Sequence, residues 1–277
     1  MNSVAIVGVG LIGGSFGLAL KAAGFTGKIL GVSSKTTIRN AIEIGAIDEG
    51  LPIERAVAAT DLVYLAQPIG RILDTVRHLD AWVRPDALVT DAGSTKHAIV
   101  SAAHANLRRC QFLGGHPMAG KETRGVQSAD GRLFTDRPYA LTPASPDELE
   151  TPAATSFIAW LKRIGARPVV IGAEEHDRLV AFSSHVPQLI STALAAALAE
   201  SAPDAARVAG PGLIDATRLA LSSYDLWRDI LATNTGAIEE ALTTYITKLE
   251  HVRDNLRTRQ LQDEFANGAG FARRLRE

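Results

Sequence analysis

A histidine in a glycine-flanked segment is the strongest sign of chemistry in this sequence. His116 lies in GGHPMAG, after the strand-like run QFLGG, and Pro117 restricts the backbone beside it. We expect this loop at the carboxyl edge of a sheet, the edge at which open α/β sheets bind ligands. An imidazole there suits proton transfer near neutral pH. Four other histidines are interpreted as incidental residues on polar or amphipathic helical faces: His78, His97, His104 and His251.

Three further motifs carry polar side chains that suit a site. Ser94 in DAGSTK follows a strand and opens a helix, so its hydroxyl either caps that helix or faces a ligand. Arg218 in DATR stands in an otherwise apolar stretch and needs an anionic partner, either a structural carboxylate or a substrate. The motif SSHVPQ places His185 and Gln188 inside a helical segment.

Other kinds of site fit the sequence poorly. No histidine or cysteine pair has the spacing of metal ligands, and the single cysteine, Cys110, forms no thiolate cluster, so we expect no metal. No G-x-S-x-G motif predicts a serine hydrolase, and DAGSTK has its lysine after the serine and threonine, unlike a Walker P-loop. One cysteine also favours a reducing, cytoplasmic location.

The N-terminal VGVGLIGG predicts a dinucleotide site. Gly8, Gly10 and Gly13 form G-x-G-x-x-G between an apolar strand and an amphipathic helix, the setting that this motif requires. The glycines permit a tight turn, close approach of a pyrophosphate and close helix packing, and the helix N-terminus adds partial positive charge.

The cofactor loop lacks the usual acid. About 20 residues beyond the fingerprint, where an acid would bind the adenosine ribose, the chain has Ser33, Ser34 and Lys35 instead. Without the acid a 2′-phosphate is not repelled, and Lys35 adds a cation. We therefore expect NADP to be preferred, with NAD as the alternative if Lys35 is only a solvated loop charge.

The elements that position these residues alternate between β-branched runs and helical patterns as far as about Gly172. This alternation predicts an α/β fold: a Rossmann-type, doubly wound, mostly parallel sheet in residues 1–173, then an all-α domain in residues 174–277. The expected strands are Val4–Gly10, Lys28–Ser33, Asp61–Pro68, Ala87–Gly93, Gln111–Gly115, Arg137–Pro143 and Arg167–Gly172. A helical stripe of apolar residues from Ile238 to Leu256 must be covered by the chain itself or by a partner subunit.

Charge and hydropathy argue against nucleic-acid and membrane partners. The 277 residues carry 29 Lys plus Arg against 30 Asp plus Glu, so no basic footprint for nucleic acid or acidic lipid is expected. The apolar N-terminus has no preceding basic region and is interrupted by glycines, which argues against a signal or membrane anchor, and later apolar runs are broken by charge. A small-molecule substrate fits better.

Taken together, these motifs resemble the prephenate/arogenate dehydrogenase family of tyrosine biosynthesis over essentially the whole chain. The landmarks are VGVGLIGGS, GAIDEG, AQPI, TDAGSTK, GGHPMAGKE, LTP, EHDRLVAFSSHVPQ, DATRLA and LWRDIL. The fingerprint is shared by many oxidoreductases, whereas GGHPMAG, SHVP and DATR in this order are far more specific.

The resemblance implies an oxidative decarboxylation, with hydride passing from ring C4 to NADP or NAD and carbon dioxide leaving C1. It implies that His116 is the general base, that Ser94 positions it, and that Arg218 binds a substrate carboxylate beside His185 and Gln188. The implied cofactor contacts are Gly8, Gly10, Leu11, Ile12, Gly13, Ser33, Ser34, Lys35, Gln67 and Pro68. It also implies a homodimer formed through the helical domain.

The sequence departs from the family pattern at two places, and two other functions remain as alternatives. Many relatives have histidine where Gln188 stands, and an aromatic and a basic residue where this chain has Leu213 and Ile214. The alternatives are another two-domain NAD(P)-linked oxidoreductase of hydroxy acids or imines, and a non-catalytic dinucleotide sensor. A sensor has no need of His116, Ser94 and Arg218 together.

Overall fold

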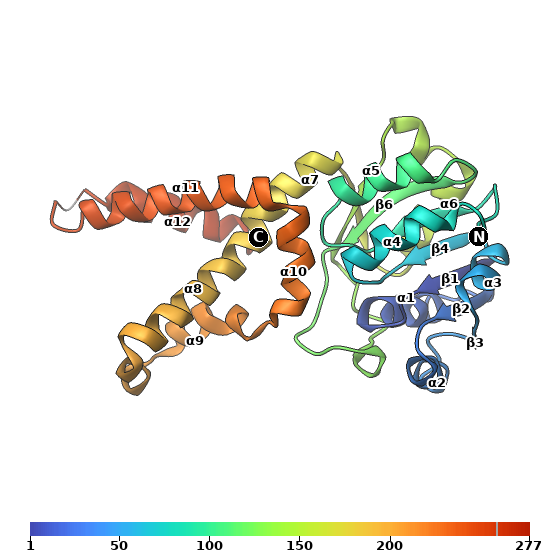
Figure 1. Cartoon of the computed structure of the whole chain (residues 1–277). Helices are drawn as coiled ribbons and strands as arrows, with labels where there is room; N and C mark the ends of the chain where they lie inside the picture. Colours follow the sequence, from blue (N-terminus) through green and yellow to red (C-terminus); the bar gives the residue numbers. More distant parts are fainter. Residues whose placement is uncertain (259) are drawn as a thin grey trace.

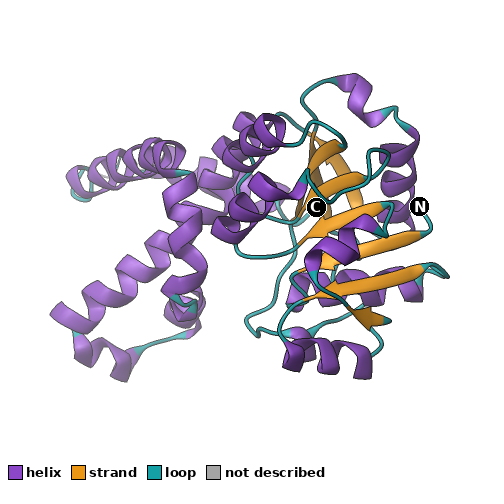
Figure 2. Ribbon diagram, turned by 45° about the vertical axis from the view of Figure 1, so that its right-hand side comes forward, coloured by secondary structure: helices purple, strands orange, loops and turns teal. Residues whose placement is uncertain are grey.

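The computed structural model describes residues 1–258 and 260–277 as a sheet domain followed by a helical domain (Figure 1). All strands of the described chain lie in the first domain (Figure 2). They are β1 (Ser3–Val7), β2 (Lys28–Val32), β3 (Glu49–Gly50), β4 (Leu62–Leu65), β5 (Leu88–Asp91), β6 (Gln111–Pro117), β7 (Pro138–Thr142) and β8 (Arg167–Val170). Its helices are α1 (Leu11–Ala22), α2 (Lys35–Glu43), α3 (Ile53–Ala58), α4 (Ile69–Leu79), α5 (His97–Asn106) and α6 (Pro152–Arg163).

The strands form one eight-stranded sheet in the order β3-β2-β1-β4-β5-β6-β7-β8. Every neighbouring pair is parallel except β6 and β7. The order reverses between β1 and β4, which creates the switch point at which such sheets bind ligands beyond the carboxyl ends of the strands. The predicted Rossmann-type, mostly parallel sheet is confirmed.

Both faces of this sheet are buried, as a doubly wound fold requires. Alternate residues of β1 enter two separate cores: Val4 and Ile6 pack on one face, Ala5 and Val7 on the other. The first core includes Phe16 of α1 and residues of α6, whereas α3, α4 and α5 cover the second. The sheet therefore gives a rigid base for the loops at its carboxyl edge.

Two details of the strands differ from the sequence expectations. The strand β3 is only two residues long, too short for a periodic pattern to reveal. His116 lies within β6 instead of a following loop, because its backbone continues the ladder opposite Ala140 of the antiparallel strand β7. The catalytic candidate therefore stands on a strand, which fixes its backbone more firmly than a loop would.

The helical domain begins with a continuous helical run of α7 (Ala173–Val180), the π-helical turn η3 (Ala181–His185) and α8 (Val186–Ser201). The later elements are α9 (Pro211–Thr217), the 3₁₀ turn η5 (Arg218–Leu221), α10 (Tyr224–Thr233), α11 (Thr235–Asp254) and α12 (Gln262–Arg274). Figure 1 shows α8 and α11 extending away from the sheet domain. The run Ala173–Ser201 is long and apolar enough to cross a membrane by length and composition alone, contrary to the expectation that charge breaks every such run.

The stripe on α11 is covered only in part. Ile238 and Ala241 are buried against Ala181 and Val186, whereas the later residues Ile246, Leu249 and Leu256 are exposed. The C-terminal half of α8 is likewise an exposed, alanine-rich surface. The helical domain thus has a small core of its own and leaves a substantial apolar surface uncovered.

The helical domain docks on the sheet domain through α10. Ile230 joins the core beneath α4, and the carboxylate of Asp229 accepts the backbone N–H of Gly70 at 2.9 Å. The hydroxyls of Thr233 and Thr95 are hydrogen-bonded at 2.7 Å. These contacts hold α10 of the helical domain against the carboxyl edge of the sheet.

The glycine turn between β1 and α1 uses two of its glycines in different ways. Gly8 has a φ of +96°, and a Cβ there would lie 2.6 Å from the carbonyl oxygen of Ala66 at the end of β4. A Cβ on Gly10, in contrast, would meet no atom within 4 Å. Gly8 therefore serves the fold, while Gly10 leaves open space in front of the helix N-terminus.

We predict that Gly8→Ala destabilises the protein by at least about 2 kcal/mol, because a positive φ costs a side chain about 1–3 kcal/mol and the overlap with Ala66 adds to it. Gly10→Ala, the control within the same turn, should change the free energy of unfolding by less than about 1 kcal/mol. Chemical denaturation of both variants measures this. Equal losses would contradict the division of roles.

Candidate active site

The residue before His116 is held by a buried ion pair. The Asp91 and Lys96 side chains, both fully buried, form a salt bridge at the end of β5. Asp91 accepts the backbone N–H of Gly115 at 3.1 Å, and Lys96 donates to the carbonyl oxygen of Gly115 at 2.7 Å. Both backbone groups of Gly115 are thereby fixed, which sets the position of His116.

The imidazole of His116 is kept neutral by its surroundings. Burial, followed by the nearby His176, Lys96 and His185, holds the pKa of His116 well below its ordinary value of 6.5. Each of these influences disfavours the imidazolium form. The lowered pKa favours the neutral imidazole of His116 near neutral pH, and a neutral imidazole is the form that can accept a proton.

A second histidine, which sequence analysis missed, contacts this base. Nε2 of His176, in α7, lies 2.9 Å from Nδ1 of His116, and Nδ1 of His176 lies 2.8 Å from Oδ1 of Asp177. His176 is 60 residues from His116 in the sequence. Its position in EEHD, at the start of the helical domain, was the only available signal, and it gave no reason to pair the two histidines.

Ser94 is not the helix cap that its position suggested. The helix α5 begins after Lys96 and has no side-chain cap from its own turn. The carboxylate of Asp177 takes that role, accepting the N–H groups of Lys96 at 2.7 Å and His97 at 2.9 Å. The Ser94 hydroxyl makes no hydrogen bond with another described residue and so has no structural assignment.

Arg218 lies across from the loop that follows His116. Its guanidinium pairs with Glu122 at 3.2 Å, and both side chains are more than half exposed. Arg124 of the same loop bonds Ser223, just beyond η5. An exposed pair of this kind contributes little stability, so an anionic ligand can displace Glu122 from Arg218 at small cost.

Gln188 and His185 lie just inside the helical domain. Gln188 donates to the carbonyl oxygen of Leu219 at 2.7 Å, which ties α8 to the turn that carries Arg218. His185 is 1% exposed, lies 3.2 Å from the side-chain nitrogen of Asn234 and packs edge-on against Trp227. Burial lowers the pKa of His185 to about 4, so it is neutral near pH 7.

The turn between β1 and α1 has the shape of an anion cradle. No side chain caps α1, so the N–H groups of Leu11, Ile12 and Gly13 have no acceptor within the helix. A Cβ on Gly10, at the N-terminus of this helix, would meet no atom within 4 Å, so there is open space beside them. This combination fits the pyrophosphate of a dinucleotide. Gln67 and Pro68 lie beside this turn, since the Gln67 backbone nitrogen would be 2.8 Å from a Cβ on Gly8.

The acid-free loop lies at the end of β2, next to this cradle. The backbone N–H of Gly8 donates to the carbonyl oxygen of Val32, the residue before Ser33, at 2.9 Å. Ser33 and Lys35 are exposed, and Ser34 caps α2 by accepting the N–H of Thr37. Arg39, also exposed and one helical turn beyond Lys35, adds a second cation on that side of α2. The sequence analysis did not single it out.

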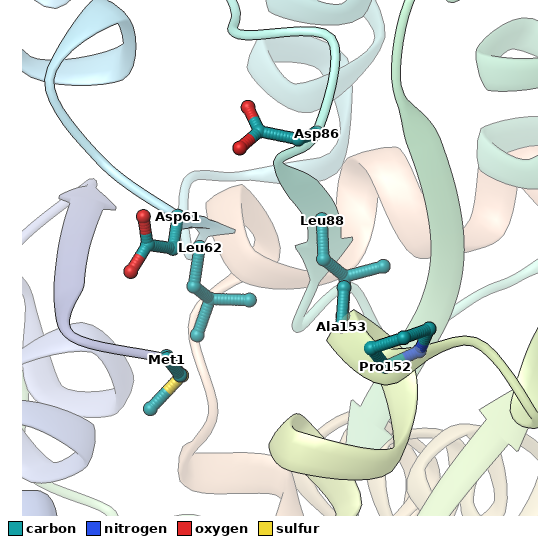
Figure 3. A pocket seen from close by; sticks show the side chains of 7 residues that line it. All are labelled: Met1, Asp61, Leu62, Asp86, Leu88, Pro152 and Ala153. Atoms are coloured by element: carbon teal, nitrogen blue, oxygen red, sulfur yellow. The ribbon is translucent and has the colours of Figure 1, made fainter.

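A separate hollow lies at the opposite, amino edge of the sheet (Figure 3). The carboxylates that line it are already paired, since Arg84 bridges Asp61 at 3.2 Å and Asp86 at 2.6 Å. Neither of these carboxylates is therefore free to bind a ligand there. Within residues 1–258 and 260–277, no group of three His, Cys, Asp or Glu side chains is arranged to hold a metal.

Comparison with known proteins gives matches over the whole chain. The family model "Prephenate dehydrogenase, nucleotide-binding domain" matches residues 16–170, and "Prephenate dehydrogenase, dimerization domain" matches residues 172–270. The prephenate dehydrogenase of Lactococcus lactis is 30% identical over 95% of this chain and 73% of its own length.

Two solved structures share the whole architecture. A prephenate dehydrogenase from A. aeolicus, in complex with hydroxyphenyl propionate and NAD+, has a TM-score of 0.89 at 30% identity, covering 100% of this chain and 99% of that one. Synechocystis arogenate dehydrogenase has a TM-score of 0.81 at 28% identity, covering 99% and 98%. These matches confirm the resemblance drawn from the motifs, and the chain belongs to the prephenate dehydrogenase family.

Proposed function

We propose that this protein catalyses the NAD(P)-dependent oxidative decarboxylation of prephenate, arogenate or both. The observation that carries the proposal is the neutral base His116, fixed at the carboxyl edge of the sheet one strand away from Asp91 and Ser94. Membership of the family supports the reaction type. A non-catalytic dinucleotide sensor would have no use for a base held in this way.

The chain's own residues supply orientation and proton transfer. His116 accepts the proton of the substrate's C4 hydroxyl, and the free hydroxyl of Ser94 orients the same group. A bound NAD(P) supplies the acceptor for the hydride that leaves C4. As carbon dioxide leaves C1 the ring becomes aromatic, so the reaction is downhill and the protein's main task is alignment.

Arg218 is proposed to bind a substrate carboxylate. A guanidinium forms paired hydrogen bonds with a carboxylate, and its exposed contact with Glu122 is readily exchanged for a ligand. Gln188 would then act by holding the Arg218 turn, since it donates to Leu219. His185 would line the same pocket.

NADP is the proposed preferred cofactor. The hydroxyls of Ser33 and Ser34 and the cations Lys35 and Arg39 lie where an acid would repel a 2′-phosphate, and all four residues are exposed. The net charge of this loop favours an anion. Leu11, Ile12, Gln67 and Pro68 would contact the rest of the dinucleotide.

A homodimer is proposed to form through the helical domain, divided from the sheet domain between residues 173 and 174. The exposed half of the α11 stripe and the alanine-rich end of α8 need a cover, and a second copy of the chain supplies a matching apolar surface. We also propose a cytoplasmic location, in keeping with the lone Cys110, whose pKa burial raises to about 12.

We expect purified protein to form NAD(P)H with prephenate or arogenate in a two-by-two assay of both substrates and both cofactors. His116→Asn should lower kcat by about 10²–10⁴-fold with cofactor affinity nearly unchanged, because a general base is lost. Arg218→Gln should mainly raise the substrate KM. No turnover in any of the four combinations, with cofactor binding intact, would refute the proposed reaction and favour a related hydroxy-acid or imine oxidoreductase.

Ser33→Asp should shift the cofactor preference from NADP toward NAD. The restored carboxylate would repel the 2′-phosphate, so the ratio of kcat/KM for NADP to that for NAD should fall by about 10–10²-fold. Ser33→Asn, which has the same shape without the charge, is the matched control. A wild-type enzyme with a clear preference for NAD would show that the cofactor proposal is wrong.

Light scattering should give a mass of about twice the 29.4-kDa chain. Leu249→Glu places a charge on the exposed stripe and should shift the protein toward monomer, because an unpaired charge is costly in an apolar interface. Thr247→Glu, on another side of α11, should leave the dimer intact. A monomeric wild type would overturn the proposed assembly.

A further inference from the structure

The contact between His116 and His176 continues into a chain of three groups. Nδ1 of His116 meets Nε2 of His176 at 2.9 Å, and the two rings are inclined at 70°. Nδ1 of His176 in turn meets Oδ1 of Asp177 at 2.8 Å. The side chains of His176 and Asp177 are only 3% and 5% exposed, so water has little access to this chain.

Asp177, at the end of this chain away from His116, is held in place by two backbone hydrogen bonds. Its two carboxylate oxygens accept the N–H groups of Lys96 and His97 at the start of α5, at 2.7 and 2.9 Å. Backbone N–H groups only donate, and the N-terminus of this ten-residue helix favours a negative charge. The side chain of Asp177 is thus held as an acceptor, and it orients the ring of His176.

The hydrogen-bond directions along the chain follow from this anchor. Since Asp177 accepts, Nδ1 of His176 must carry the proton, which leaves a lone pair on Nε2 of a neutral ring. That lone pair accepts Nδ1–H of His116. The remaining lone pair of neutral His116 is therefore on Nε2, and no described residue hydrogen-bonds to that atom.

We infer that His176 and Asp177 are positioning residues that hold His116 in the tautomer whose Nε2 is the base. The inference rests on the proposed function and deepens it. His176 also fixes the ring plane of His116, and the carboxylate of Asp177 favours the imidazolium that forms when the substrate's proton arrives. The proton stays on His116, as in the serine-protease triad, where the buried aspartate orients the histidine without being protonated.

A docking role alone would not explain this geometry. Asp177 could join α7 to α5 with its two backbone contacts and no histidine beside it. Instead a buried imidazole connects that carboxylate to the base. The titratable groups around His116 are Lys96, with its partner Asp91, from the β5–α5 turn, His176 and Asp177 from α7, and His185 from η3.

Asp177→Asn is the central test. Asparagine keeps the shape but removes the negative charge that favours the imidazolium of His116, and its NH₂ group must face one of the two backbone N–H groups that Asp177 accepts. We expect kcat to fall by at least about tenfold with the substrate and cofactor KM values within about threefold of wild type. The same loss should persist across the pH profile, since titration does not restore the missing charge.

Two further variants separate positioning from packing. His176→Gln supplies a side-chain oxygen to accept Nδ1–H of His116 and should retain at least about tenfold more kcat than His176→Leu, which offers no acceptor. Thr233→Ala removes the neighbouring interdomain hydrogen bond to Thr95 and should leave kcat near wild type. Equal losses in His176→Gln and His176→Leu, or a comparable loss in Thr233→Ala, would overturn the inference.

The tautomer is read independently of activity by ¹⁵N–¹H correlation spectra of ¹⁵N-histidine-labelled full-length protein. His116 should carry its proton on Nδ1 in the wild type and in His176→Gln, and this preference should be lost in His176→Leu, which offers no acceptor. If the wild type turns over no substrate but shows the expected tautomers, the proposed function fails and the positioning geometry stands. An active wild type with His116 protonated on Nε2, or an Asp177→Asn variant with wild-type kcat, would overturn the inference.

Discussion

The buried ion pair of Asp91 and Lys96 is the interaction on which the site depends. Two opposite charges without solvent are stable only when their remaining hydrogen bonds are satisfied, and here the backbone of Gly93 and Gly115 satisfies them. The pair thereby joins the turn that carries Ser94 to the strand that carries His116. Loss of either charge would leave the other buried without a partner, so fold and chemistry are coupled at this point.

The second constraint comes from the helical domain. The strand β6 fixes the backbone of His116, but its ring is oriented by His176, which belongs to α7. Asp177 in turn completes α5 of the sheet domain by supplying the acceptor that its N-terminus lacks. Neither domain contains the whole arrangement. The base acquires its orientation only when the two domains are docked.

Much of the fold could be predicted from the sequence because its signals are local. Alternating β-branched and helical segments gave the sheet and its helices, and the glycine fingerprint gave the cofactor turn. The two-residue strand β3 is too short to show an alternating pattern of apolar and polar residues. His116 was assigned to a loop because glycines and proline suggested one, whereas pairing with Ala140 of β7 extends the strand through it.

The arrangement of the site depends on contacts that no local pattern reveals. Ser94 looked like a helix cap by position, yet a carboxylate about 80 residues away provides that cap. The motif EEHD gave no hint that His176 reaches His116, because the contact exists only after docking. Residue types predicted a base and an anion clamp, but the partners that orient them come from the tertiary structure.

The elements α7, η3 and α8 form one continuous helix that connects two parts of the site. His176 lies near the start of this helix. Gln188, which holds the Arg218 turn through Leu219, lies about 18 Å further along the same helix. Because the helical backbone is continuous from α7 through the π-helical turn η3 into α8, a rotation at the domain contact would displace both residues. In the proposed function, the orientation of the base and the binding of the substrate therefore depend on the same domain contact.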